Sequence, residues 1–347
     1  MIECRNLGKS YGTVQAVSDI SLSLDEHEFL SILGPSGCGK STLLRLIAGL
    51  EVPSQGQVFL HGQEISGRKI ILPPERRKFG MIFQDFALFP HLSVKDNVGY
   101  GATGSKKEKQ QRVHELLELV SLSHLATKMP HQISGGEQQR IAVARALAPR
   151  PRLILMDEPF SNLDYQLRQQ LRRDIREILK HEGVATVLVT HDQVEAITFS
   201  DRMLLIRKGK VVQEGTPSEI YQNPQTIWAS SFVGEANHLP VEWNNGSLRT
   251  PLGELNVPSE TGMNASTMMV RPEDFKLELV PPDLANGIVK SVDFSGSVQI
   301  VSVVLKSGAS VQFSGSPHLL WNQNDSVKIT AERYLYFNSS GNRLNGI

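Results

Sequence analysis

One segment of the sequence, Gly34-Pro35-Ser36-Gly37-Cys38-Gly39-Lys40-Ser41, matches the pattern G-x-x-x-x-G-K-[ST] of phosphate-binding loops and indicates the type of fold. The apolar run 29–33 just before it predicts a buried strand, and residues 40–50 predict the helix that follows. Between a strand and a helix, the N–H groups of the loop and of the helix N-terminus can surround phosphate oxygens. We therefore expect Lys40 to reach the β- and γ-phosphates of a nucleotide, and Ser41 to bind Mg²⁺.

A glycine-rich turn without a ligand is the alternative explanation of this stretch. The bare pattern arises by chance in roughly one such chain in a hundred, before the flanking strand and helix are required. The alternative is therefore disfavoured, and Thr42 can add a further phosphate contact. Cys38 stands at a variable position of the loop, where we interpret it as a small filler residue rather than as a redox-sensitive thiol.

Two further apolar runs, 153–156 and 187–190, predict buried strands that end in polar side chains. Asp157 follows the first run and can hold Mg²⁺ through water, while Glu158 can act as a base for an attacking water. His191 follows the second run, at the sheet edge where open α/β sheets bind ligands, and can polarise a γ-phosphate. A strand followed by an acidic loop, and a structural histidine, are the plain alternatives.

Two more segments are candidates for the same site. Gln84 is a possible contact of Mg²⁺ and water, although an ordinary surface glutamine would look the same. In the segment 134–140, Ser134 and Glu137 have the spacing of a helix capping box. A purely structural role would explain these two residues. Two consecutive glycines, Gly135 and Gly136, are not needed for a capping box but allow a phosphate to approach the backbone. One fold can hardly place this helix over its own phosphate loop, so we expect it to act on a second subunit's nucleotide.

Composition limits the class of protein. The 347 residues contain 36 Lys+Arg and 36 Asp+Glu, which argues against a polybasic nucleic-acid binder. No run of about 18 apolar residues and no secretory signal is visible, so we expect a cytosolic chain without its own anchor. Two cysteines, Cys4 and Cys38, are too few for a disulfide framework or a zinc cluster.

The order of elements predicts an α/β domain over 1–236 with an inserted helical subdomain at about 86–150. Within the insertion, 106–120 has the spacing of a surface helix. From 237 to 347, short alternating runs and turn signals predict a small all-β domain.

Taken together, these motifs resemble the ATP-binding subunit of an ABC transporter over residues 1 to about 235. The resemblance implies a P-loop ABC-type ATPase fold that uses ATP and Mg²⁺. It assigns nucleotide binding to Tyr11, Gly34, Pro35, Ser36, Gly37, Cys38, Gly39, Lys40, Ser41 and Thr42. It assigns metal contacts to Ser41, Gln84 and Asp157, and catalytic roles to Glu158, His191 and Gln84. It assigns contacts with the second subunit's nucleotide to the signature residues Ser134, Gly135, Gly136 and Glu137. It also identifies a D-loop at 161–164, which contains Asp164.

The signature departs from the usual pattern. This family more often reads Leu-Ser-Gly-Gly-Gln, whereas the chain has Ile133 and Glu137. A carboxylate at Glu137 would weaken the affinity for a partner's γ-phosphate unless it stays turned into the capping box. We expect activity to be retained.

The last 110 residues or so resemble the oligonucleotide-binding-like (TOBE-type) domain of importer subunits, through 269–274 and the glycine turn at 294–297. The phrases at 234–240 and 83–94 look most similar to ferric-iron importers, with sugar, polyamine and sulfate importers as alternatives. The resemblance implies a homodimer on the cytoplasmic face of the inner membrane. Its expected partners are two permease subunits gripped by the Gln84 region and the helical subdomain, with a solute-binding protein acting indirectly.

Other classes fit the sequence less well. Soluble ABC ATPases that act on ribosomes or nucleic acid commonly pair two cassettes in one chain and tend to be basic at that interface. This chain has one cassette and no net charge, so we expect no nucleic-acid partner. A P-loop kinase outside this family would leave 134–138 and His191 unexplained.

Overall fold

The computed structural model describes residues 1–67, 69–161 and 164–344. The chain divides into two compact units, Met1–Ser218 and Glu219–Ile347. Residues 219–236 thus group with the C-terminal unit, whereas the sequence placed the domain boundary at 236/237. In the part of the chain that the structure describes, no helix is long and apolar enough to cross a membrane.

A six-stranded sheet with the order β10-β9-β3-β8-β7-β6 forms the centre of the first unit. All its neighbouring strands are parallel except β10, which is antiparallel to β9. Its strands are β3 (Phe29–Leu33), β6 (Phe79–Ile82), β7 (Leu153–Asp157), β8 (Ala185–Thr190), β9 (Arg202–Arg207) and β10 (Lys210–Gly215). The predicted strand at 29–33 is therefore confirmed, and the run at 153–156 is extended by one residue.

The central strands are apolar throughout because both faces of the sheet are buried. On β7, Leu153 and Leu155 belong to the core on the α1 side, whereas Ile154 and Met156 belong to the core on the α5 side. Alternate side chains of one strand therefore serve two cores. This pattern explains why these strands appear in the sequence as continuous apolar runs rather than as alternating ones.

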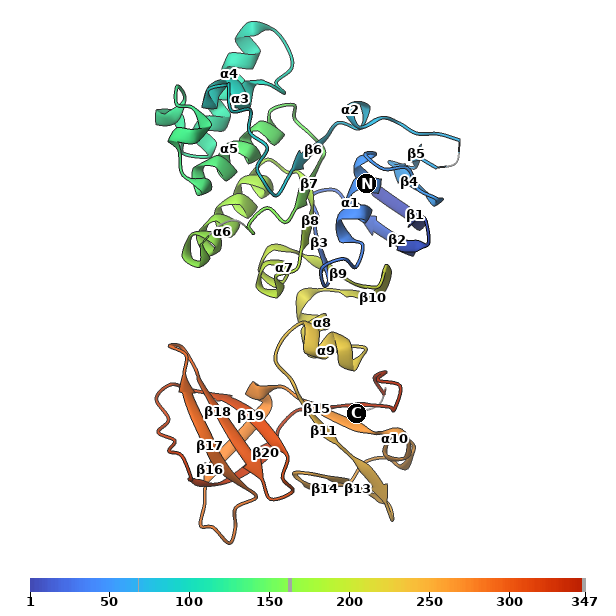
Figure 1. Cartoon of the computed structure of the whole chain (residues 1–347), viewed down its shortest axis with the longest axis vertical. Helices are drawn as coiled ribbons and strands as arrows, with labels where there is room; N and C mark the ends of the chain where they lie inside the picture. Colours follow the sequence, from blue (N-terminus) through green and yellow to red (C-terminus); the bar gives the residue numbers. More distant parts are fainter. Residues whose placement is uncertain (68, 162–163, 345–347) are drawn as a thin grey trace. The chain divides into compact units, whose positions relative to one another are not determined.

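An antiparallel sheet with the order β2-β1-β4-β5 lies on one side of the parallel sheet, and a group of helices lies on the other (Figure 1). The antiparallel strands are β1 (Ile2–Tyr11), β2 (Val14–Leu24), β4 (Gln55–Leu60) and β5 (Gln63–Ser66). The helices of the unit are α1 (Lys40–Ala48), α2 (Pro74–Arg77), α3 (Val94–Gly99), α4 (Lys106–Leu119), α5 (Gly135–Leu147), α6 (Tyr165–His181) and α7 (Gln193–Phe199). Short 3₁₀ turns lie at Ser123–Leu125 and Pro130–Gln132. The surface helix expected at 106–120 is thus confirmed as α4.

The second unit is mostly β, and one short helix and one 3₁₀ turn lie within the segment 237–347 that was predicted to be all-β. The helices of this unit are α8 (Pro217–Gln222), α9 (Ile227–Phe232) and α10 (Ser259–Asn264), with a 3₁₀ turn at Pro272–Asp274. One three-stranded sheet consists of β11 (Asn237–Pro240), β15 (Thr267–Val270) and β21 (Leu335–Phe337). Another consists of β12 (Glu242–Asn244), β13 (Ser247–Thr250) and β14 (Gly253–Leu255). The five-stranded sheet consists of β16 (Phe275–Leu279), β20 (Ser326–Ala331), β17 (Gly287–Phe294), β18 (Gln299–Leu305) and β19 (Ser310–Gly315).

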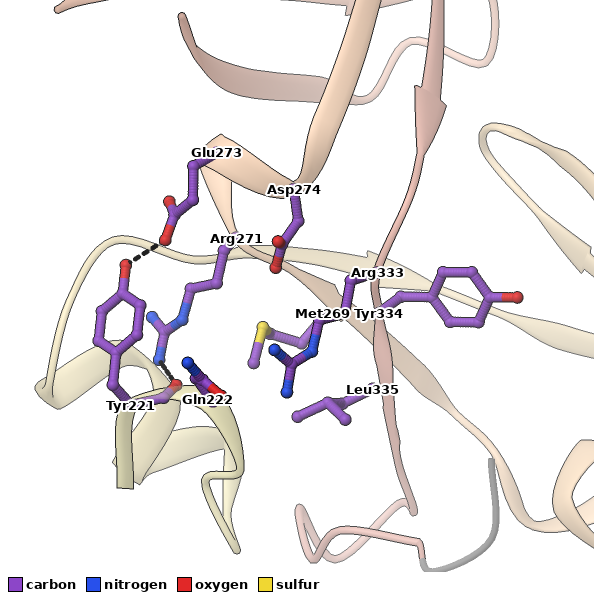
Figure 2. A pocket seen from close by; sticks show the side chains of 9 residues that line it. All are labelled: Tyr221, Gln222, Met269, Arg271, Glu273, Asp274, Arg333, Tyr334 and Leu335. Carbon is purple, nitrogen blue, oxygen red and sulfur yellow. Dashed lines mark hydrogen bonds between the residues drawn. The ribbon is translucent and has the colours of Figure 1, made fainter. Parts of the chain in front are cut away.

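Arg271, just after β15, ties the start of this unit to its sheets. Its side chain is 3% exposed, and Nη1 donates to the carbonyl oxygens of three residues, Ser230 (2.9 Å), Gly234 (3.1 Å) and Glu235 (2.8 Å). Nη2 donates to the Tyr221 carbonyl at 2.8 Å, and the guanidinium lies 4.1 Å from the centre of the Tyr221 ring. Figure 2 shows this contact beside the hydrogen bond from the Tyr221 hydroxyl to Glu273.

Burial lowers the pKa of Arg271 and raises that of Tyr221 to about 12, so the phenol stays neutral at neutral pH. Arg271 supplies one cation to four carbonyl oxygens of this segment, those of Tyr221, Ser230, Gly234 and Glu235. Arg271 therefore determines how residues 221–235 pack against β15.

We predict that Arg271→Ala lowers the free energy of unfolding of the C-terminal unit by roughly 2–4 kcal/mol, because buried carbonyl groups lose their charged donor. All three tryptophans, Trp228, Trp243 and Trp321, lie in this unit, so their fluorescence in urea reports its unfolding. Arg249→Ala is the matched control, since its exposed side chain reaches Glu254 only at 4.0 Å and should matter by less than about 0.5 kcal/mol. Equal urea concentrations at the midpoint of unfolding for the two variants would refute this role of Arg271.

Candidate functional site

The phosphate loop lies between β3 and α1, as the sequence predicted. Gly39 is the N-cap of α1, with φ 107°, and a β-carbon there would lie 2.1 Å from the Ala16 carbonyl oxygen. Only glycine fits this position, because both the left-handed backbone and the close approach exclude a side chain. No side chain caps α1 and its first turn has no acidic residue, so its start has the features of an anion-binding helix N-terminus.

Lys40 and Cys38 are both buried in this loop. The Lys40 side chain donates from Nζ to the carbonyl oxygens of Gly34 (2.8 Å) and Pro35 (3.1 Å), which holds the cation over the loop. Cys38 is 5% exposed, and burial raises the pKa of its thiol. A buried thiol that resists ionisation agrees with the interpretation of Cys38 as a filler residue.

Ser41 and Asp157 meet where α1 begins and β7 ends. The Ser41 hydroxyl donates to Asp157 Oδ1 at 2.8 Å, across 116 residues of sequence. Burial raises the pKa of the Asp157 carboxyl, and a nearby cation would favour its charged form. A hydroxyl and one carboxylate beside a phosphate loop form the oxygen donor set that Mg²⁺ shares with nucleotide phosphates. Among the described residues, no group of three or more His, Cys, Asp or Glu side chains could hold a metal ion without such a ligand.

Glu158 and His191 form a second pair at the same sheet edge. Glu158 has φ 46°, and its N–H donates to the Val189 carbonyl oxygen at 2.9 Å. Its Oε2 lies 3.0 Å from Nδ1 of His191, in the residue directly after β8. The structure thus brings together the two residues that the sequence had assigned to water activation.

Glu195 supports the turn that carries His191, and the sequence analysis missed it. Thr190 donates its hydroxyl to Glu195 Oε2 at 2.5 Å, and the Asp192 N–H donates to the same Thr190 hydroxyl at 3.0 Å. Glu195 is 2% exposed, and burial raises the pKa of its carboxyl. A carboxylate three residues after the N-cap Asp192 was the available signal, although only half of a capping box forms: Asp192 accepts the Glu195 N–H at 2.9 Å, and the Glu195 carboxylate binds Thr190 instead.

Gln84 and Tyr11 lie at the borders of this site. Gln84 is exposed and stands two residues after β6, which pairs with β7 in parallel. It therefore extends from the same edge of the sheet as Asp157. Tyr11 ends β1 and is 45% exposed; burial and the Glu51 carboxylate raise the pKa of its hydroxyl, whereas Thr42 lowers it. Tyr11 thus lies beside the first turn of α1, and Lys9 Nζ lies 4.9 Å from the centre of its ring.

The signature segment begins α5, on the other face of the parallel sheet from α1. Buried α5 residues belong to the core on one face, and those of α1 to the core on the opposite face. Within one chain, the structure therefore does not bring Ser134, Gly135, Gly136 and Glu137 together with the phosphate loop.

The expected capping box at Ser134 is confirmed. The Ser134 N–H donates to Glu137 Oε2 at 2.7 Å, and its hydroxyl donates to the same oxygen at 2.8 Å. These hydrogen bonds lower the pKa of Glu137, so its carboxylate is charged and turned into the cap. Gly136 also has a packing reason, since a β-carbon there would lie 3.0 Å from the Leu167 side chain.

The D-loop is described only in part. Asp164 is the N-cap of α6 and accepts the Leu167 N–H at 3.0 Å. Residues 162–163 of this predicted loop lie outside the described residues.

Comparison with known proteins agrees with this geometry. Residues 17–161 match the family model described as ABC transporter. The chain is 44% identical over 306 residues to "Fe(3+) ions import ATP-binding protein FbpC" of Pseudomonas fluorescens, covering 87% of this chain and 86% of that protein. It is 38% identical over 317 residues to "Fe(3+) ions import ATP-binding protein FbpC 2" of Haemophilus influenzae, covering 89% of each.

Two solved structures support the same assignment. A dimeric post-hydrolysis state of the ATP-binding cassette MJ0796, bound to ADP and Pi, superposes with a TM-score of 0.54 at 33% identity, covering 62% of this chain and 99% of that one. The cbiO1 subunit of the Clostridium perfringens transporter complex cbiONQ superposes with a TM-score of 0.59 at 28% identity. The match covers 64% of this chain and 90% of that one. The chain therefore belongs to the ABC transporter family, among its ATP-binding proteins.

Proposed function

We propose that this chain is the ATP-hydrolysing subunit of an importer that takes ferric iron into the cell. The observation that carries the ATPase assignment is the pair of contacts at one sheet edge, Ser41 with Asp157 and Glu158 with His191. Iron as cargo is supported by relatives named for Fe(3+) import, whose similarity extends over both units rather than the ATPase core alone.

The residues of the phosphate loop hold ATP. The loop N–H groups and Lys40 contact the phosphates, and the Tyr11 ring stacks on the base. The N-terminal partial charge of α1 favours the same anionic groups. Ser41, Asp157 and Gln84 hold Mg²⁺, which neutralises charge on the phosphates when it is bound.

Hydrolysis requires a general base, and Glu158 acts as this base. Glu158 accepts a proton from the attacking water, whose oxygen bonds to the γ-phosphorus as the bond to the ADP oxygen breaks. His191 contacts the same carboxylate at 3.0 Å, orients it, and polarises the γ-phosphate. Thr190 and Glu195 keep the His191 turn in place through buried hydrogen bonds.

A homodimer completes each site. Because Ser134, Gly135 and Gly136 lie across the sheet from their own phosphate loop, they act on the ATP of the partner, with Asp164 in the loop between the sites. The dimeric state of the related cassette MJ0796 supports this arrangement. Glu137 stays in the capping box, so its charge does not prevent closure around ATP.

The remaining assignments follow from the importer function. The chain works at the cytoplasmic face of the inner membrane, where residues near Gln84 and the helical subdomain at 86–150 contact two permease subunits. An external solute-binding protein delivers iron to those subunits. Residues 237–347 form a TOBE-type, oligonucleotide-binding-like domain that serves dimerisation or regulation, and residues 1–236 form the ATPase domain.

We predict that Glu158→Gln lowers kcat for ATP by about 10²–10³-fold, because the amide cannot accept a proton from water. Binding of a fluorescent ATP analogue should be retained, since the phosphate loop is unchanged. Glu177→Gln is the control, an exposed carboxylate on α6 that should hydrolyse ATP at the wild-type rate. Wild-type kcat in Glu158→Gln would refute Glu158 as the base.

Mixed dimers test the action of the signature in trans. When Ser134→Arg and Glu158→Gln stand on different chains, one site keeps both an intact Glu158 and an intact partner Ser134, so hydrolysis persists. When both substitutions stand on the same chain opposite a wild-type chain, each site has lost one of the two residues, and hydrolysis stops. Dimers purified through two affinity tags give both rates, and the reverse order would show that Ser134 acts in cis.

Uptake in cells that lack this gene tests the cargo. We expect the wild-type gene to restore uptake of labelled ferric iron, and Glu158→Gln to fail, because import needs hydrolysis. Maltose, a polyamine and sulfate are offered in parallel. Rescue of one of these solutes instead of iron would keep the ATPase assignment and overturn the iron assignment.

A further inference from the structure

Gln84 lies in a tight turn whose exit has an unusual backbone. The Phe86 N–H donates to the Phe83 carbonyl oxygen at 3.0 Å, which places Gln84 at the second position of a β-turn. Phe86, the last residue of this turn, and the following Ala87 have φ values of 57° and 49°. Two consecutive left-handed residues with β-carbons are unfavourable, so the surrounding structure must hold them.

Arg145 supplies that support from α5. Its Nη2 donates to the Phe86 carbonyl oxygen at 2.9 Å, and its Nη1 donates to the Ala87 carbonyl oxygen at 2.6 Å. The guanidinium therefore binds the carbonyl groups of the two left-handed residues and no others in this turn. It also lies 5.4 Å from the centre of the Phe89 ring, which fixes the direction of the chain after the turn.

A second anchor begins just beyond the turn. The buried Asn97 of α3 binds both the N–H and the carbonyl oxygen of Phe89, at 2.8 and 3.1 Å. Asn97 thus holds the segment downstream of Ala87, and Arg145 holds it at Phe86 and Ala87. The Phe86 side chain is also buried in the core that contains α5, so Arg145 and this packing, rather than Asn97, hold the conformation next to Gln84.

We propose that Arg145 is a positioning residue for Gln84: it holds Phe86 and Ala87 in the left-handed conformation that directs the Gln84 turn toward the nucleotide. This inference rests on the proposed role of Gln84 in hydrolysis. Arg145 stands on the helix that Ser134 begins, so it also links the turn at one ATP to the segment that meets the other ATP. Because α5 is one helix, a displacement of the Arg145 contact can be transmitted to the Ser134 segment at the start of α5.

The first test is the rate of ATP hydrolysis by the full chain. We expect Arg145→Ala to lower kcat by about ten- to a hundredfold, as a misplaced positioning group does. KM for ATP should stay within about twofold, because Arg145 donates its hydrogen bonds to Phe86 and Ala87, which are not residues of the phosphate loop. Arg145→Lys should also lose rate, since one ammonium cannot reproduce the two-pronged contact, and it serves if Arg145→Ala fails to fold by circular dichroism.

Rescue separates positioning from general stability. Ala87→Gly removes a β-carbon from a left-handed residue, so it should restore much of the rate lost in the Arg145 variants. Arg112→Ala is the matched control: Arg112 is another buried arginine of this region, and it donates to the Leu147 carbonyl oxygen at 3.1 Å, away from the turn. Ala87→Gly should not rescue Arg112→Ala, and equal rescue of both, or of neither, would overturn the proposal.

A double-mutant cycle with Gln84→Ala completes the test. If Arg145 acts through Gln84, Arg145→Ala should lower kcat by less than about twofold further in the Gln84→Ala chain. If Arg145→Ala lowers kcat by the same factor in the Gln84→Ala chain as in the wild type, the positioning role is overturned. The proposed function of Gln84 is then unaffected. A Gln84→Ala chain with wild-type kcat would instead overturn the proposed role of Gln84, and the inference with it.

Discussion

The hydrogen bond between Ser41 and Asp157 is the contact on which the rest of the site depends. It joins the start of α1 to the end of β7, and it forms only because β3 and β7 both pair with β8 in a parallel sheet. Parallel strands bring their carboxyl ends to one edge, so Glu158 and His191 meet beside the same pair. The apolar cores on both faces of the sheet hold this edge in register.

Much of the fold could be predicted from local sequence, because the signals are local in origin. A strand buried on both faces must be apolar throughout, and the run at 29–33 is β3 to the residue. The capping box at Ser134 needs only residues three positions apart, and it forms as expected. The residues of the phosphate loop were predicted from one stretch, since the strand, loop and helix follow one another directly.

Contacts between distant residues were not predictable in the same way. Arg145 binds carbonyl groups 58 and 59 residues away, and Arg271 binds carbonyl groups 36 to 50 residues away. A backbone carbonyl has no residue-specific signal, so nothing in the sequence indicates which arginine will meet it. The helix α10 of the C-terminal unit was missed because its six residues are too few for a clear helical period.

We propose that Ser41 and Asp157 form, with nucleotide phosphates, the magnesium site of an ATPase. The most direct measurement is the affinity of the chain for a fluorescent ATP analogue, with and without Mg²⁺, in the wild type and in Asp157→Asn. We expect Mg²⁺ to strengthen binding to the wild type and Asp157→Asn to lose most of this gain, because the carboxylate charge is gone. The same gain from Mg²⁺ in both proteins would contradict it.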